Sequence, residues 1–113
     1  MPAGSSIVNI CSIAGNVVGA ATWYSAAKAG VAGLTRSLAV AHGPRGLRVN
    51  AVCPGEINTA ILSPGTEALV ERIPLKRLGS PDEVSAAIYY LCSDQASYIT
   101  GAEIPVNGGQ DVY

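Results

Sequence analysis

Residues 22–42 have the sequence TWYSAAKAGVAGLTRSLAVAH, and this stretch decides the fold. Within it, Val31, Leu34 and Leu38 recur at helical spacing, so we predict an amphipathic helix with these three side chains on its buried face. Gly43 follows at once and precedes a proline, a combination typical of a helix end. We therefore expect one helix over the whole stretch.

The same helix is unusually slim, because most of its early positions are Ala or Gly. Gly30 and Gly33 each cost about 1 kcal/mol of helix propensity. We expect the close approach of another element to compensate for that cost.

β-branched apolar runs lie on both sides of this helix in the sequence. Residues 6–11 (SIVNIC) and 47–53 (LRVNAVC) are short, apolar and followed by turn-forming residues. Both patterns predict buried strands. A third, shorter run covers residues 103–107 and is closed by two glycines, which predicts a last strand.

A second helix is marked by its first turn. Ser80, Pro81 and Glu83 stand at the spacing of a capping box, with the proline at the first helical position. A loop is expected over residues 56–74, with a short helix near residues 67–72. The apolar side chains of the helix that follows the capping box fall on one side: Val84, Ala87, Ile88 and Leu91.

The resulting β-α-β-α-β order predicts parallel strands joined by crossover helices, in an α/β layer. A length of 113 residues leaves room for one domain, which we expect to cover residues 1–113. Hydrophobic residues make up 49% of the chain and charged residues 13%, which indicates a globular interior rather than disorder.

Charge and cysteine usage exclude several classes of function. The net charge of −1 and the lack of a basic run argue against nucleic-acid or acidic-membrane partners. The uncharged first 27 residues are interrupted by polar residues and glycines, which favours a strand and loop over a membrane segment. Three separated cysteines and a single histidine, His42, favour reduced thiols in the cytoplasm and no metal site.

Three polar side chains suggest chemistry. Tyr24 and Lys28 stand four residues apart at the start of a helix and so share one face. A phenol has a reference pKa of about 10, and a nearby ammonium lowers it. Such a pair can take a proton from an alcohol or give one to a carbonyl oxygen. Ser12, after the first strand, could hydrogen-bond the same oxygen. Taken singly, such a pair would usually be an amphipathic surface pair, and a serine after a strand is most often a turn residue.

Together with further segments, these residues resemble the short-chain dehydrogenase/reductase family, over residues 4–110, and within it members of the 3-oxoacyl-(acyl-carrier-protein) reductase type. Five segments match in the family's order. They are the serine strand at 4–15, the Tyr-x-x-x-Lys motif at 24–30, the strand and Pro-Gly turn at 48–59, and the last helix and strand at 77–84 and 98–109. The resemblance implies the C-terminal part of a Rossmann-type doubly wound parallel sheet, with about three strands.

The resemblance also implies roles for single residues. Tyr24 would be the acid/base, Lys28 its activator and a ligand of the nicotinamide ribose, and Ser12 the residue that polarises the substrate oxygen. Residues 56–73 would form the substrate-binding loop. The turn after the second strand would contact the nicotinamide through Pro54, Gly55, Ile57 and Thr59. Asn50, Gly101, Asn107 and Gly109 are expected to be structural.

The family's Gly-rich phosphate turn does not occur in these 113 residues. The resemblance therefore implies a catalytic half without the dinucleotide-binding half. Its coenzyme would be NAD or NADP, without a residue to decide between them, and its state a homodimer or homotetramer. Two functions follow: an oxidoreductase that interconverts a small alcohol and a carbonyl, or a non-catalytic fragment that associates with full-length relatives or with a complementary half.

Overall fold

The computed structural model describes residues 1–11, 22–58 and 65–110, and only the backbone of residues 22–25. Its elements follow in the predicted β-α-β-α-β order. The strands are β1 (Ser6–Ile10), β2 (Arg48–Pro54) and β3 (Glu103–Val106). The helices are α1 (Thr22–His42), α2 (Thr66–Glu71) and α3 (Pro81–Cys92), with 3-10 turns at Gly43–Arg45 and Asp94–Ala96. None of the described helices is long and apolar enough to cross a membrane.

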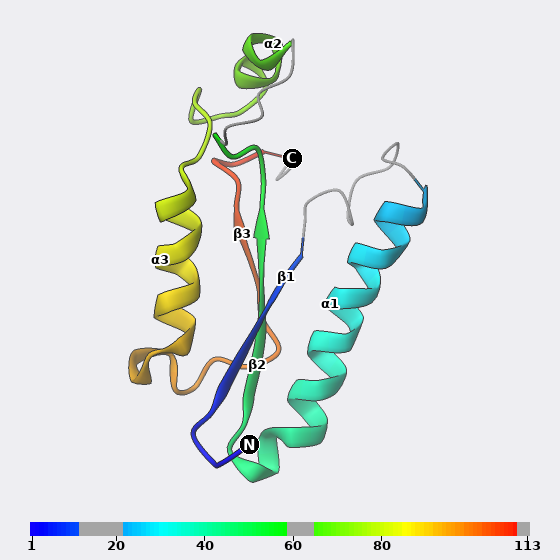
Figure 1. Cartoon of the computed structure of the whole chain (residues 1–113), viewed down its shortest axis with the longest axis vertical. Coiled ribbons are helices and arrows are strands. Elements are labelled where there is room, and N and C mark those ends of the chain that lie inside the picture. Colours follow the sequence, from blue (N-terminus) through cyan, green and yellow to red (C-terminus); the bar gives the residue numbers. More distant parts are fainter. Residues whose placement is uncertain (12–21, 59–64, 111–113) are drawn as a thin grey trace.

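The three strands form one parallel sheet in the order β1-β2-β3. The register pairs Ile10 with Val52 and Val52 with Ile104. The central strand, β2, is buried along most of its length, as expected for a parallel strand with both faces covered. Figure 1 shows α1 and α3 on opposite sides of the strands. This confirms the predicted α/β layer.

The predicted capping box of α3 is confirmed. The Ser80 hydroxyl accepts from the Glu83 N–H at 3.3 Å, and the Glu83 carboxylate accepts from the Ser80 N–H at 2.9 Å. The predicted apolar side of this helix packs on the sheet, with Leu91 1% exposed. Local sequence therefore sets both the start of α3 and the face that it buries.

The buried face of α1 differs from the prediction. Ala32, Thr35 and Ala39 are its buried side chains, whereas the predicted Leu34 is 53% exposed. Small residues let the helix lie close to β2, so the sheet contacts a face offset from Leu34, whereas the predicted Leu38 packs, partly buried, against Ala39, Leu47 and Val49. The predicted close approach at the two helix glycines is not made by any described atom of this chain. A Cβ added at Gly30 or Gly33 would meet none of them within 4 Å.

A buried asparagine holds the sheet to the loop before β3. Asn50 is 0% exposed; its amide donates to the Ile99 carbonyl and its Oδ1 accepts from the Ala102 N–H, both at 2.9 Å. Gly101 has a positive φ of 75° in the same loop. Both positions support the expected structural roles.

Candidate catalytic and cofactor site

The carboxyl ends of the three strands meet at one edge of the sheet, because the strands are parallel. Helix α1 begins beside this edge, and α2 lies beyond the end of β2 (Figure 1). Ligands of open α/β sheets bind at this edge. The predicted site residues all stand on segments that begin or end there, so the edge is the candidate site.

Lys28 is tied to the end of β1. The thiol of Cys11 lies 3.5 Å from the Lys28 backbone carbonyl and donates to it. Cys11 is 2% exposed, and Lys28 is partly buried. Tyr24 lies one turn earlier in α1, where the structure describes its backbone but not its side chain. Ser12 follows Cys11 directly and lies outside the described residues. The structure therefore describes the end of β1 beside α1, but not how the side chains of Ser12, Tyr24 and Lys28 lie relative to one another.

The Pro54-Gly55 turn packs tightly against the end of β3. The Gly55 N–H donates to the Val106 carbonyl at 2.9 Å, and a Cβ on Gly55 would lie 2.7 Å from the Asn107 Cβ. Only glycine fits this approach. Beside it lies the Oε1 of Gln110, a buried acceptor that no donor of the described residues reaches. No sequence pattern predicted this acceptor.

Ile57 is held by a short parallel bridge with Gly79. The bridging hydrogen bonds come from its neighbours: the Gly79 N–H donates to the Glu56 carbonyl at 2.9 Å, and the Asn58 N–H donates to the Gly79 carbonyl at 2.8 Å. The Ile57 N–H and C=O take no part in this bridge and face the opposite side. Thr59, the remaining predicted contact, lies outside the described residues.

Two cysteines that are distant in the sequence lie side by side at this edge. Cys11 and Cys53 belong to one buried cluster with Ala32 and Ala51. Burial first, and then the hydrogen bond with the Cys11 thiol, raise the pKa of the Cys53 thiol to about 12. The cysteines are far apart in the sequence and were not predicted to be neighbours. Aligning the ends of the two predicted strands, residues 6–11 and 47–53, indicates this pair.

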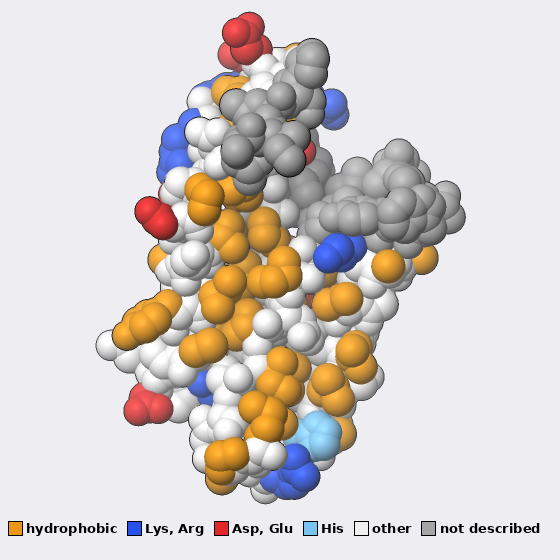
Figure 2. All heavy atoms as spheres, viewed as in Figure 1, with side chains coloured by type: hydrophobic (Ala, Val, Ile, Leu, Met, Phe, Trp, Pro, Cys, Tyr) orange, Lys and Arg blue, Asp and Glu red, His pale blue; other side chains and the backbone are white. Residues whose placement is uncertain are grey.

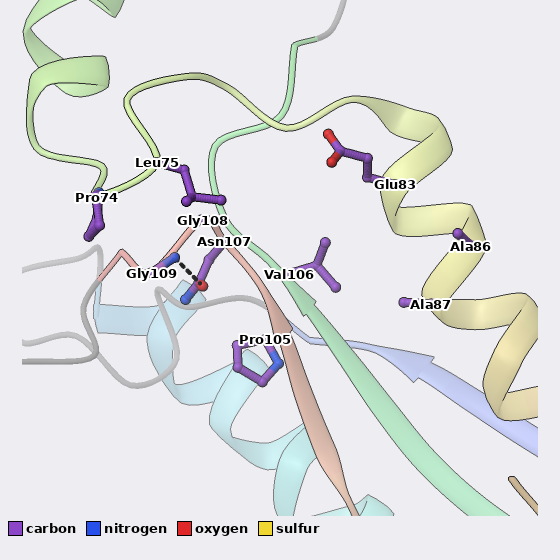
Figure 3. A pocket seen from close by; sticks show the side chains of 10 residues that line it. All are labelled: Pro74, Leu75, Glu83, Ala86, Ala87, Pro105, Val106, Asn107, Gly108 and Gly109. Atoms are coloured by element: carbon purple, nitrogen blue, oxygen red, sulfur yellow. Dashed lines mark hydrogen bonds between the residues drawn. The ribbon is translucent and has the colours of Figure 1, made fainter.

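An open groove of about 730 Å³ lies between α3 and the end of β3. Figure 3 shows its lining, with Glu83 and Ala87 on the helix side and Val106 and Asn107 on the strand side. None of the predicted catalytic or cofactor residues lines it. The Gly109 N–H donates to the Asn107 Oδ1 at 3.1 Å within its wall, which supports a structural role for both.

Ile73, at the end of the predicted substrate loop, is 1% exposed. A Cβ on Gly108 would lie 2.9 Å from its Cγ2, so Ile73 anchors the loop against the turn after β3. Among the described residues, no three His, Cys, Asp or Glu side chains gather as metal ligands would.

Comparison with known proteins assigns the chain to a family. A sequence profile described as Enoyl-(Acyl carrier protein) reductase matches residues 1–111. Protein FixR of Bradyrhizobium diazoefficiens is 57% identical over 111 residues, which are 96% of this chain and 40% of that protein. The 3-oxoacyl-(acyl-carrier-protein) reductase FabG of Pseudomonas aeruginosa is 47% identical, over 91% of this chain and 44% of that protein.

Solved structures agree. An oxidoreductase of the short-chain dehydrogenase/reductase family from Burkholderia thailandensis superposes with a TM-score of 0.90 and 38% identity, over 96% of this chain and 45% of that one. The chain thus spans less than half the length of these relatives, and its three strands and their helices form part of a Rossmann-type fold. The chain belongs to the short-chain dehydrogenase/reductase family.

Proposed function

We propose that residues 1–113 act as one domain that supplies the proton-transfer and nicotinamide part of an NAD(P)-dependent oxidoreductase, which interconverts an alcohol and a carbonyl. The observation that carries this proposal is the contact between the end of β1 and α1. It ties Cys11, which precedes Ser12, to Lys28, which lies one turn after Tyr24. Segments bearing all three proposed catalytic residues thus meet at the sheet edge where ligands bind.

In this mechanism Tyr24 carries the proton. Its phenol gives the proton to a carbonyl oxygen in reduction and takes it back in oxidation. The Lys28 ammonium, four residues on, favours the phenolate form through its charge. Tyr24 also lies in the first turn of α1, where the helix dipole favours a negative charge. Ser12 donates a hydrogen bond to the substrate oxygen and stabilises the charge that develops there.

The residues at the end of β2 fit the nicotinamide end of the coenzyme. Gly55 lets the turn pack directly against Asn107, where a Cβ would clash, and the Ile57 N–H and C=O face away from their bridge, where they suit a carboxamide. We propose that they bind it together with Pro54 and Thr59, while Lys28 binds the ribose. NAD(P) supplies or accepts the hydride when bound. The 113 residues contain no Gly-rich phosphate turn, so we propose no contact between them and the pyrophosphate of the coenzyme.

The first test is a fluorescence titration of the purified chain with NADH and NADPH, followed by turnover of acetoacetyl-CoA. That substrate is chosen because an acetoacetyl-CoA reductase of Shinella zoogloeoides is 45% identical to this chain. We expect Tyr24→Phe to lower turnover by about 10²- to 10⁴-fold while leaving coenzyme binding in place. Tyr98→Phe is the matched control, because Tyr98 is fully exposed. Equal activity of both variants would contradict the assignment of Tyr24.

A second function has its own observation. The outer edge of β1 carries no other strand of the described chain, and Ile10 on it is 44% exposed. Figure 2 shows apolar side chains over the strands between α1 and α3 on this side of the molecule. An unpaired apolar edge strand binds another strand readily. A non-catalytic chain would use it to join a second copy, a full-length relative or a complementary half.

The two functions are separated by what the chain binds. Coenzyme binding by the chain alone supports the oxidoreductase. Association with a full-length relative, measured by light scattering and without coenzyme binding, supports the non-catalytic partner.

A further inference from the structure

We propose that Cys11 and Cys53 form a reversible disulfide between β1 and β2 in the folded chain, with a peroxide as the oxidant. This modification site is independent of the proposed catalysis. It rests on the register of the two strands, on the contact between the thiols and on their common burial.

The register makes the two cysteines direct neighbours. Ile10 is paired with Val52, so the next positions, Cys11 and Cys53, continue the same ladder. The Cys11 N–H extends it by donating to the Val52 carbonyl at 2.7 Å. Adjacent strands lie about 4.8 Å apart, which falls within the Cα separation of about 4.4–6.8 Å found across disulfides.

The side chains also face one another. Both point to the α1 side of the sheet and share a cluster with Ala32. The Cys11 thiol donates to the Lys28 carbonyl, and the neighbouring Cys11 sulfur helps to raise the pKa of the Cys53 thiol. A disulfide needs Cβ atoms about 3.8 Å apart, less than the strand spacing, so the strands must draw together slightly. β1 is the edge strand of the described sheet, so only one neighbouring strand holds it.

The chemistry balances in two steps. Peroxide transfers one oxygen to the Cys11 sulfur, which becomes a sulfenic acid, and the first water forms. The Cys53 sulfur then attacks the Cys11 sulfur; the S–S bond forms, and the hydroxyl leaves with the Cys53 proton as a second water. Two thiols lose two electrons in total, and one peroxide is reduced to two waters. A small oxidant is required because the cysteines are only 2% and 3% exposed.

The disulfide changes the candidate site, a consequence that rests on the proposed function. Oxidised Cys11 has no proton and can no longer donate to the Lys28 carbonyl. The bond that joins the end of β1 to the second turn of α1 is thereby lost, while the Pro54-Gly55 turn is tied to the residue before Ser12. A dithiol reductant restores both thiols and the original contact.

The first test uses the intact wild-type chain. The three cysteines fall in separate tryptic peptides, which end at Lys28, Arg72 and the chain terminus. After hydrogen peroxide and alkylation with N-ethylmaleimide under denaturing conditions, we expect one adduct, at Cys92, and a mass loss of about 2 Da. Dithiothreitol before alkylation should restore adducts on all three free cysteines.

Oxidation in urea is the matched control. Cys11 and Cys92 are each about 40 residues from Cys53, so loop closure gives both pairings a similar chance in the unfolded chain. The folded chain should instead form the Cys11–Cys53 link at least tenfold more often than the Cys53–Cys92 link. Cys92→Ser removes the exposed competitor and should leave no alkylatable thiol after oxidation. Two alkylated thiols at Cys11 and Cys53 in the oxidised folded chain, or equal shares of the two links, would overturn the proposal.

Discussion

Helices α1 and α3 cover opposite faces of the same strands, yet they bury different kinds of side chain. Under α3, Val52, Leu91 and Ala96 form a cluster with many partly buried apolar neighbours around it. Under α1, the buried residues are split into two smaller clusters, to which the helix contributes Ala32, Ala39 and the partly buried Leu38. The α3 face is therefore the larger apolar core, and the α1 face is a thin layer.

The thin face is also the face of the candidate site. The Cys11 thiol donates to the Lys28 carbonyl there, and the Thr35 hydroxyl hydrogen-bonds Asn9 and Val31, so polar contacts join this face. The outward side of α1 leaves Leu34 53% and Val40 80% exposed. Polar positioning groups suit the proton transfer proposed for the α1 face, whereas large apolar side chains on the α3 face stabilise the sheet. This difference predicts where substitutions destabilise the chain and by how much.

The largest effect is expected on the α3 face. Leu91→Ala should lower the free energy of unfolding by about 3 kcal/mol, because it opens a cavity beside Val52. Leu34→Ala, the same substitution on the outside of α1, should cost less than about 1 kcal/mol. Urea unfolding followed by circular dichroism measures both. If the two losses were equal, the outer side of α1 would be covered in solution, for instance by a second copy.

A smaller effect should separate polar from apolar support on the α1 face. The Thr35 hydroxyl accepts from the Asn9 amide at 3.0 Å and donates to the Val31 carbonyl at 2.8 Å. Thr35→Val keeps the volume but leaves the Asn9 donor unpaired, at a cost of about 2 kcal/mol. Thr35→Ser keeps both hydrogen bonds and loses one methyl group, at a cost of about 1 kcal/mol. The reverse ranking in urea unfolding would mean that apolar packing dominates this face too.

Much of the fold could be predicted from local patterns. The capping box at Ser80 fixed the start of α3, because both of its hydrogen bonds join residues only three apart. The limits of α1 followed from its apolar spacing and from Gly43. The parallel order followed from the alternation of strands and helices. In each case the deciding interactions are close in the sequence or follow from chain connectivity.

The remaining features depend on contacts between distant segments. Leu34 was predicted to share the apolar face of α1, but the small residues Ala32 and Ala39 contact the sheet and leave Leu34 exposed. The Cys11–Cys53 pair depends on the register of two strands 42 positions apart (53 − 11). The acceptor of Gln110 beside Gly55 depends on how the chain folds after β3. The roles of the residues in the candidate site came from the resemblance to the family. The positions of Lys28, Pro54, Gly55 and Ile57 came from the structure.

The smallest effect is expected at the start of α3 and appears only as a pH dependence. Two hydrogen bonds from the Arg77 guanidinium, at 2.7 and 2.9 Å, and one from the Ser80 N–H lower the pKa of Glu83 from 4.5 to about 2. A lowered folded-state pKa stabilises the chain above pH 4.5, and this contribution is lost as the pH falls toward 2. It is small because the pair is exposed.

Glu83→Gln should therefore melt at a slightly lower temperature than the wild type at pH 7, and the difference should vanish near pH 2. Glu67→Gln changes the net charge equally at an exposed position of α2 and serves as the control. A Glu83→Gln difference that stayed constant from pH 7 to pH 2 would assign the effect to the altered side chain rather than to its charge. A melting-temperature difference that disappears at low pH would show that the stability of the chain also depends on the charged N-terminal cap of α3, although far less than on Leu91.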